Sequence, residues 1–298
     1  MTTAVTYARV AVASSRPPQL ALVLGVYLLG AAVAVANGTP LSVSTGALGA
    51  APLVAVAASI HYANEYADHE TDALTDRTPF SGGSGALVET DVPRAFVLGL
   101  ATVTLGAGLL AAGLLALADV LGTRALAVLV GATAVGWQYS LGPLRLAWRG
   151  WGELTNAVLG GLALPVYGAA VLDGPLVTVA LAAVPFFLVV LLNLFATQWP
   201  DREADAVVSK RTLAVRWSAR RLRTAYAGIA ALAGASLLAL HPAVVPTPVL
   251  LATLPVAPLV AWGAYGYTRR QVPWPTVTAM VALAVLQFAA WAWVAWGQ

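Results

Sequence analysis

The feature that most constrains this chain is a series of long apolar runs that contain no charged residue. A helix needs about 20 apolar residues to cross the hydrocarbon core of a bilayer, and each run comes near that length. All 16 basic and 13 acidic residues lie outside the runs. We therefore predict nine transmembrane helices, which cover residues 20–36, 46–63, 95–118, 125–140, 154–172, 175–199, 224–240, 247–267 and 274–297.

Composition agrees with a membrane protein. Hydrophobic residues make up 59% of the chain and the mean hydropathy is +0.79, whereas soluble domains are about 45–50% apolar. The runs lack the polar alternation of barrel strands, which favours helices over a β-barrel. We predict an all-α polytopic protein in which residues 1–298 form a single domain and one bundle. The absence of cysteine excludes disulfides, thiolate metal sites and thiol catalysis.

The distribution of charge predicts an orientation. If the N-terminus is cytoplasmic, every arginine and lysine except Arg124 falls on the cytoplasmic side, which is a strong positive-inside bias. Of the acidic residues, only Asp119 and Asp173 fall on the opposite side. Membrane topology thus explains the pI of about 9.4, and no nucleic-acid partner is expected. We predict a multi-pass protein of the cell membrane whose N-terminus and charged loops are cytoplasmic and whose C-terminus is outside.

Two segments at the ends of apolar runs repeat one spacing of polar residues. Asn64-x3-Asp68-x3-Asp72 follows the second run, and Asp201-x3-Asp205 follows the sixth. Residues four apart on a helix differ by only about 40° around its axis, so each motif forms one stripe. Four helices separate the motifs, which places both on the same face of the membrane. Their separation of 133 residues suggests two four-helix halves plus a ninth helix, arranged as a parallel repeat.

The spacing of these carboxylates indicates a metal site. Like charges one turn apart repel each other, and carboxylates beside hydrocarbon are costly unless a cation compensates them. Mg²⁺ prefers oxygen ligands and usually takes one or two carboxylates together with substrate phosphates. We expect two Mg²⁺ ions, with ligands drawn from Asn64, Asp68, Asp72, Asp201 and Asp205.

Lys210, the only lysine in the chain, follows Asp201 by nine residues. On a continuous helix it would point away from the aspartate stripe, so we expect the chain to turn after Asp205 and bring the ammonium to a substrate phosphate. Its neighbour Arg211 and the earlier Arg77 are further candidates for phosphate contacts. Anchoring to anionic lipid headgroups is the alternative role for this basic segment.

The two motifs resemble those of the UbiA-type intramembrane prenyltransferases, and the resemblance covers essentially the whole chain. It rests on Asn64-Glu-Tyr-Ala-Asp-His-Glu-Thr-Asp72 and on Asp201-Arg-Glu-Ala-Asp205 followed by Lys210-Arg-Thr-Leu-Ala-Val215. The chain looks most like the 1,4-dihydroxy-2-naphthoate prenyltransferases of the menaquinone branch, through Lys210–Val215, Arg149-Gly-Trp-Gly-Glu153 and Phe80-Ser-Gly-Gly-Ser-Gly85. Glu65 departs from the family pattern, in which Asp is commoner.

The resemblance implies transfer of an isoprenyl chain from an isoprenyl diphosphate to an aromatic acceptor similar to 1,4-dihydroxy-2-naphthoate, in quinone biosynthesis. The reaction would proceed by Mg²⁺-assisted ionisation and electrophilic aromatic substitution. It implies catalytic roles for Asp68, Asp72, Asp201, Asp205 and Lys210. It implies substrate binding by Asn64, Arg77, Tyr139, Arg145, Lys210 and Arg211, where Tyr139 lies at the end of the fourth run and Arg145 lies between the fourth and fifth runs.

Several alternatives stay open. The acceptor is a hydroxybenzoate, a chlorophyllide or a glycerol-phosphate lipid if the menaquinone assignment fails. An ion-coupled transporter is less favoured, because the acidic residues lie at helix ends and no charged residue lies within a run. Phosphatidyl transfer between lipid alcohols also uses spaced aspartates, but the Asp-Gly and Ala-Arg elements expected with them are missing. The length of the prenyl chain, any general base and the oligomeric state are not fixed by these residues.

Overall fold

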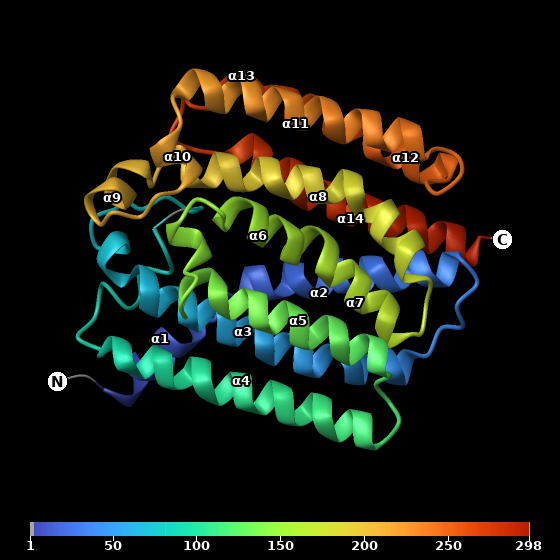
Figure 1. Ribbon diagram of the computed structural model, residues 1–298, viewed down its shortest axis with the longest axis horizontal. Helices are drawn as coiled ribbons and strands as arrows, with labels where there is room; N and C mark the ends of the chain where they lie inside the picture. Colours follow the sequence, from blue (N-terminus) through green and yellow to red (C-terminus); the bar gives the residue numbers. More distant parts are fainter. Residues whose placement is uncertain (1–2, 81, 298) are drawn as a thin grey trace.

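The computed structural model describes residues 3–80 and 82–297 as a bundle of helices that run along the long axis of the molecule (Figure 1). Expectations that concern Ser81 and the chain ends lie outside the described residues. No strand occurs within the described ranges, so the all-α prediction is confirmed. In the same ranges, eight helical segments are long and apolar enough to cross a membrane, one fewer than predicted.

Each of the nine predicted runs is helical. The elements in chain order are α1 (Ala4–Ser14), α2 (Pro17–Ala36), α3 (Val43–Asp72), α4 (Arg94–Leu117), α5 (Thr123–Ser140), η1 (Leu146–Trp148), α6 (Gly152–Val158), η2 (Leu159–Ala163), α7 (Leu164–Val171), α8 (Leu176–Gln198), α9 (Arg202–Val207), α10 (Leu213–Arg216), α11 (Ala219–Leu240), α12 (Thr247–Thr253), η3 (Leu254–Val256), α13 (Ala257–Gly266) and α14 (Trp274–Trp296).

Helix α5 accounts for the difference between nine predicted and eight observed spans. It has 18 residues, begins beside Arg124 and ends in the polar sequence Gln138-Tyr139-Ser140. The longer helices leave their polar ends outside an apolar stretch, but α5 is too short to do so. The fourth predicted run is therefore a helix of the bundle, packed against α3, α6 and α7, without the apolar length of the others.

The centre of the bundle is formed by α2, α8 and α14, and α4 and α11–α13 lie at its two sides (Figure 1). The largest apolar cluster joins these central helices through Val26, Phe186 and Leu283, each at most 2% exposed. The outer helices instead expose large apolar side chains, such as Leu114 of α4 and Leu238 of α11. Such faces suit contact with lipid.

Helix α1 is an element that the apolar runs did not predict. A turn at Arg16, whose φ is 55°, separates it from α2. Pro17 then fixes the first turn of α2. The hydroxyl of Tyr62 donates to the carbonyl of Ala11, and His61 Nδ1 lies 2.8 Å from the carbonyl oxygen of Ser15. These contacts hold α1 against α3 and place Arg16 at the end of α3 that carries the first motif.

Helices α3 and α8 correspond to each other in the predicted repeat. Each has a proline in its interior, Pro52 in α3 and Pro185 in α8. Pro52 precedes Asp68 by 16 residues, and Pro185 precedes Asp201 by the same number. The offset of 133 residues that relates the aspartates thus also relates the prolines, which supports the predicted correspondence within the helices that carry the motifs.

The membrane segment Gly152–Val171 is not a regular α-helix. A π-helical segment, η2, separates α6 from α7. Gly161 in this segment lies against the backbone of Phe187 in α8, where a Cβ atom would overlap that backbone. Beyond η2, the hydroxyl of Tyr167 in α7 donates to the carbonyl of Gly49 in α3 at 2.9 Å. The interruption thus lies at a point where this segment approaches the backbone of α8 closely.

Candidate active site

The two aspartate motifs line one cavity of about 450 Å³. The side chains that they contribute are Asp68 and Asp72 from α3 and Asp201 and Asp205 from the start of α9, with Lys210 beside them. The cavity lies at the end of the bundle that carries α9 and α10 (Figure 1). The prediction that the motifs emerge on one face is therefore confirmed by their position.

The first motif belongs to the continuous helix α3, which has 30 residues and ends at Asp72. Asn64 Nδ2 donates to Asp68 Oδ2 at 2.8 Å, and to Ser140 Oγ of α5 at 3.0 Å. Asp68 is 8% exposed. The predicted stripe thus exists, and Asn64 acts within it as a hydrogen-bond donor to the aspartate one turn later.

The second motif lies on a separate short helix. Helix α8 ends at Gln198, and Asp201 precedes the six residues of α9. The backbone N–H of Asp205 donates to the carbonyl of Asp201 at 2.8 Å. Asp205 is only 2% exposed, and Thr212 Oγ1 donates to its Oδ2 at 3.3 Å.

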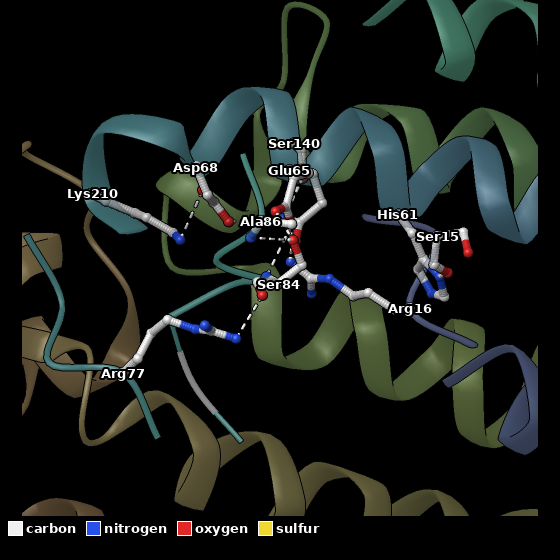
Figure 2. Close-up of polar contacts among 11 residues, drawn as sticks. Ser15, Arg16, His61, Glu65, Asp68, Arg77, Ser84, Ala86, Ser140 and Lys210 are labelled. Atoms are coloured by element: carbon white, nitrogen blue, oxygen red, sulfur yellow. Dashed lines mark hydrogen bonds and ion pairs between the residues drawn. The ribbon is translucent and has the colours of Figure 1, made fainter. Parts of the chain in front are cut away.

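The chain turns after Asp205, as the spacing of Lys210 required. Ser209 has a φ of 63°, and the backbone N–H of Lys210 donates to the carbonyl of Asp205 at 2.8 Å. The Lys210 ammonium then lies 3.0 Å from Asp68 Oδ1 and 3.5 Å from Asp205 Oδ1; Figure 2 shows the bond to Asp68. Lys210 therefore connects the two motifs directly.

Electrostatics of this cluster favour the ionised lysine. Burial lowers the pKa of Lys210, but the carboxylates of Asp68 and Asp205 outweigh it and raise the pKa above its ordinary value. For Asp205, burial raises the pKa of the carboxyl group, and the positive charge of Lys210 opposes this rise. The site thus holds a charged ammonium where a substrate phosphate would meet the two motifs.

The segment that carries Lys210 is fixed by residues of η1 and α6. Glu153 is 1% exposed, and its Oε1 accepts a hydrogen bond of 2.7 Å from the backbone N–H of Leu213. The N–H of Arg211 donates to the carbonyl of Trp148 at 3.0 Å. In the sequence, Glu153 is part of a stretch that resembles the family, but the pattern predicts no role for it. Its partner lies 60 residues away, so no local pattern indicated the contact.

A second buried carboxylate, Glu65, fixes the loop after the first motif. Glu65 Oε2 lies 3.0 Å from Arg16 Nη2 and accepts a 3.2 Å hydrogen bond from the N–H of Ser84. Glu65 Oε1 accepts from the Ser84 hydroxyl, and Arg77 Nη2 donates to the Ser84 carbonyl at 2.6 Å (Figure 2). The sequence predicts no role for Arg16 in the site, because membrane orientation already explains a cation before an apolar run.

The remaining predicted substrate-binding residues differ in position. Tyr139 and Arg77 line the aspartate cavity, and Arg77 also pairs with Glu89 at 3.0 Å. Arg145 is exposed, and its guanidinium lies 4.1 Å from the ring centre of Trp148. Arg211 is also exposed. Neither Arg145 nor Arg211 is among the residues that line the cavity.

The donor set fits a metal ion that is bound jointly with phosphate. Within the ranges the structure describes, no three His, Cys, Asp or Glu side chains lie close enough to hold a metal by themselves. Asp205 Oδ1 is buried and accepts no hydrogen bond in the described residues, although Lys210 lies 3.5 Å away. Mg²⁺ commonly takes one or two carboxylates and completes its shell with water and phosphate, which the facing pairs of aspartates permit.

Two further cavities adjoin the aspartate cavity. One of about 260 Å³ shares Arg16, Tyr139 and Asn156 with it and extends between apolar side chains such as Phe186 and Ile60. The other, of about 710 Å³, is lined mainly by α2 and α14 and shares Gln19, Phe80 and Thr197 with the aspartate cavity. The charged end of the site thus adjoins mostly apolar cavities, and the larger of them has the volume of an ordinary ligand pocket.

Comparisons with known proteins place these features in one family. The model of the UbiA prenyltransferase family matches residues 22–283. A UbiA homologue from Archaeoglobus fulgidus, solved with DMAPP and Mg²⁺, aligns with a TM-score of 0.67 and 17% identity over 94% of this chain and 98% of that chain. The apo UbiA homologue from Aeropyrum pernix K1 gives 0.70 and 18% over 90% and 96%.

A digeranylgeranylglyceryl phosphate synthase also aligns, with a TM-score of 0.67 and 11% identity over 96% of this chain and 99% of that chain. No curated protein matches the sequence. At these identities, the solved structures show that the fold is shared.

Proposed function

Because this chain belongs to the UbiA prenyltransferase family, it is an intramembrane prenyltransferase, and we propose that its acceptor is 1,4-dihydroxy-2-naphthoate or a close aromatic analogue. The observation that carries the proposal is the single cavity in which both aspartate motifs meet Lys210. The choice of acceptor rests on the menaquinone-type sequence features at 80–85, 149–153 and 210–215.

Asp68, Asp72, Asp201 and Asp205 would hold Mg²⁺ together with the oxygens of an isoprenyl diphosphate, and we propose one ion for each motif. Asn64 orients Asp68 through their 2.8 Å hydrogen bond. When bound, the metal neutralises the charge that develops on the departing diphosphate. The A. fulgidus homologue was solved with DMAPP and Mg²⁺ bound, which supports an isoprenyl diphosphate and Mg²⁺ as the substrate and cofactor proposed here.

Lys210 supplies a fixed positive charge at the point where the diphosphate leaves. Its ammonium is a compact donor that reaches both motifs. A preorganised cation of this kind stabilises the negative charge that develops in the transition state more than a solvent-exposed cation would. Arg77 lines the same cavity and offers a second cation.

The apolar cavities would hold the isoprenyl chain and exclude water from the allylic cation that ionisation leaves. The electron-rich ring of the acceptor then attacks this cation and forms the new carbon–carbon bond. With dihydroxynaphthoate, attack at the carbon that bears the carboxylate is completed by loss of CO₂. Tyr139 lines both the aspartate cavity and the adjoining cavity, and we propose that the acceptor ring approaches the cation beside it.

We also propose the orientation that the charge distribution predicts, with the aspartate cavity on the cytoplasmic side. Helix α14 leads away from that end of the bundle to the opposite end (Figure 1). A C-terminal tag should therefore be accessible only from outside intact cells, and the site loops only from the cytoplasm. Labelling of an engineered cysteine at exposed Asp119 would check this, because the native chain has no cysteine.

An acceptor screen tests the proposed function. Purified protein in lipid nanodiscs with Mg²⁺ and labelled geranylgeranyl diphosphate would receive dihydroxynaphthoate, hydroxybenzoate, chlorophyllide or a geranylgeranylglyceryl phosphate in separate reactions. We expect pyrophosphate release and a prenylated product with dihydroxynaphthoate, loss of both with EDTA, and recovery with Mg²⁺. Faster transfer to another acceptor would replace the proposed substrate, and full turnover after chelation would refute the metal role.

A further inference from the structure

Glu65 lies inside the first aspartate motif but faces away from the aspartate stripe. It follows Asn64 by one residue, which turns it by about 100° around α3. It is 2% exposed and does not line the aspartate cavity. Both carboxylate oxygens already have partners, in Arg16 and in the N–H and hydroxyl of Ser84. Its position thus differs from that of a ligand shared with Asp68.

The partners of Glu65 belong to the wall of the cavity. Gly82, Gly83 and Ser84 line it, and Gly83 adopts a φ of 64° with its backbone so close to Asp72 that a Cβ atom would overlap the carboxylate. Ser84 is held on two sides, because Glu65 binds its N–H and hydroxyl while Arg77 binds its carbonyl at 2.6 Å. Figure 2 shows the hydrogen bonds that Glu65 and Arg77 make with Ser84.

Arg16 depends on the same carboxylate. Its side chain lines both the aspartate cavity and the adjoining 260 Å³ cavity. Nη2 pairs with Glu65 at 3.0 Å, whereas Nε is buried and has no hydrogen-bond partner among the described residues. Removal of Glu65 would leave a partly buried guanidinium without its compensating charge, and the Arg16 side chain would no longer be held in one orientation between the two cavities.

We propose that Glu65 is a positioning residue for prenyl transfer, which fixes both the glycine-containing wall at 82–84 and the Arg16 guanidinium around the diphosphate. This inference rests on the proposed binding of the diphosphate in the aspartate cavity. Loss of Glu65 loosens the surface that the diphosphate contacts while every aspartate ligand stays in place. The effect is therefore on affinity for the diphosphate, with less effect on the chemical step.

Four variants test the proposal. Glu65→Ala should raise KM for the isoprenyl diphosphate about tenfold and change kcat less than about threefold, since one buried charged contact is lost. Glu65→Gln keeps an acceptor for Ser84 and should raise KM less. Ser84→Ala should also raise KM less, because it keeps the backbone contact. The matched control is Glu70→Gln, further along the same helix, because Glu70 is 70% exposed and pairs with Arg94 at the surface.

Two further measurements separate positioning from other roles. Amide hydrogen exchange of a peptide that spans 82–90, measured without substrate, should be faster in Glu65→Ala and unchanged in Glu70→Gln. The Mg²⁺ concentration for half-maximal rate at saturating diphosphate should stay at the wild-type value. A Mg²⁺ requirement that rises as strongly as in Asp68→Ala would make Glu65 a metal ligand and overturn the proposal.

Wild-type KM together with wild-type exchange in Glu65→Ala would also overturn it. If Glu65→Ala does not fold, Glu65→Gln and Ser84→Ala decide the question through the same two readouts. Failure of the proposed function is distinguishable, because it would appear as absence of turnover in the wild-type protein, whereas the exchange measurement without substrate would still test the contacts of Glu65.

Discussion

The two aspartate motifs occupy corresponding positions in the predicted repeat, yet the chain supports them in different ways. The first motif lies within the 30 residues of α3. The second follows the end of α8 and lies on α9, which has six residues. A helix this short is not stable by itself in water. The first motif is therefore placed by its own helix, and the second depends on contacts with other parts of the molecule.

Each predicted half also has one buried glutamate, and the two glutamates position different segments of the site. Glu65 binds the loop that follows the first motif through Ser84. Glu153 binds the segment that follows the second motif through Leu213, and that segment carries Lys210. We infer that disruption near Glu65 alters the wall around the substrate, whereas disruption near Glu153 moves a catalytic charge.

The largest effects are expected from the aspartates, where the two halves should behave alike. Asp68→Ala, Asp72→Ala, Asp201→Ala and Asp205→Ala should each lower kcat/KM by about a thousandfold or more, because loss of one ligand damages the site shared by metal and diphosphate. Prenyl transfer with labelled substrate measures this. Asp119→Asn, at an exposed position away from the cavity, is the control.

Wild-type transfer by the two variants of one motif would show that only the other motif binds metal, and the functional equivalence of the halves would be wrong. Near-normal activity in all four variants would remove the metal site altogether.

Lys210 should give the next largest effect, because it contacts both motifs. Lys210→Ala should lower kcat about a hundredfold, equivalent to about 2.7 kcal/mol of barrier. Lys210→Arg should recover part of the activity, since a planar guanidinium has a different reach. Single-turnover kinetics measure the effect, with Arg220→Ala as the control for loss of an exposed cation. An unchanged rate in Lys210→Ala would make this lysine a headgroup anchor.

Glu153 offers the sharpest contrast with Glu65. Glu153→Ala should lower kcat about tenfold with a smaller change in KM, because the N–H of Leu213 loses its buried partner and the Lys210 segment shifts. Glu153→Gln should be milder, since the amide oxygen still accepts that hydrogen bond. Steady-state kinetics of both variants and of Glu65→Ala measure how each substitution divides its effect between kcat and KM. An increase confined to KM in Glu153→Ala would mean that Glu153, like Glu65, acts on affinity for the diphosphate.

The smallest effects are expected for Arg145 and Arg211. Both are exposed and neither lines the cavity, so Arg145→Ala and Arg211→Ala should change kcat/KM by less than about threefold. The same transfer assay measures this. A loss above about thirtyfold in either variant would restore the direct substrate contact that the family resemblance implied, and would show that the exposed loops close over bound substrate.

Sequence alone predicted the features that depend on local spacing. Apolar runs specify the helices, and a four-residue period specifies the stripe of Asp68 and Asp72, because both follow from the geometry of one helix. The contacts of Arg16 and Glu153 join residues 49 and 60 positions apart, so they follow only from how the helices pack. Helix α1 was missed because it is shorter than a membrane span and Arg9 interrupts its apolar character.

The π-helical segment η2 has a consequence for the length of the chain between Val158 and Leu164. A π turn accommodates one more residue than an α turn, so the two ends of the segment are out of phase by about 100° relative to a regular helix. The N-terminal end presents Glu153 to Leu213, and the C-terminal end presents Tyr167 to Gly49. A regular α-helix of the same length would therefore turn one of these contacts away by about 100°, whereas deletion of a single residue within the segment would let a regular α-helix make both.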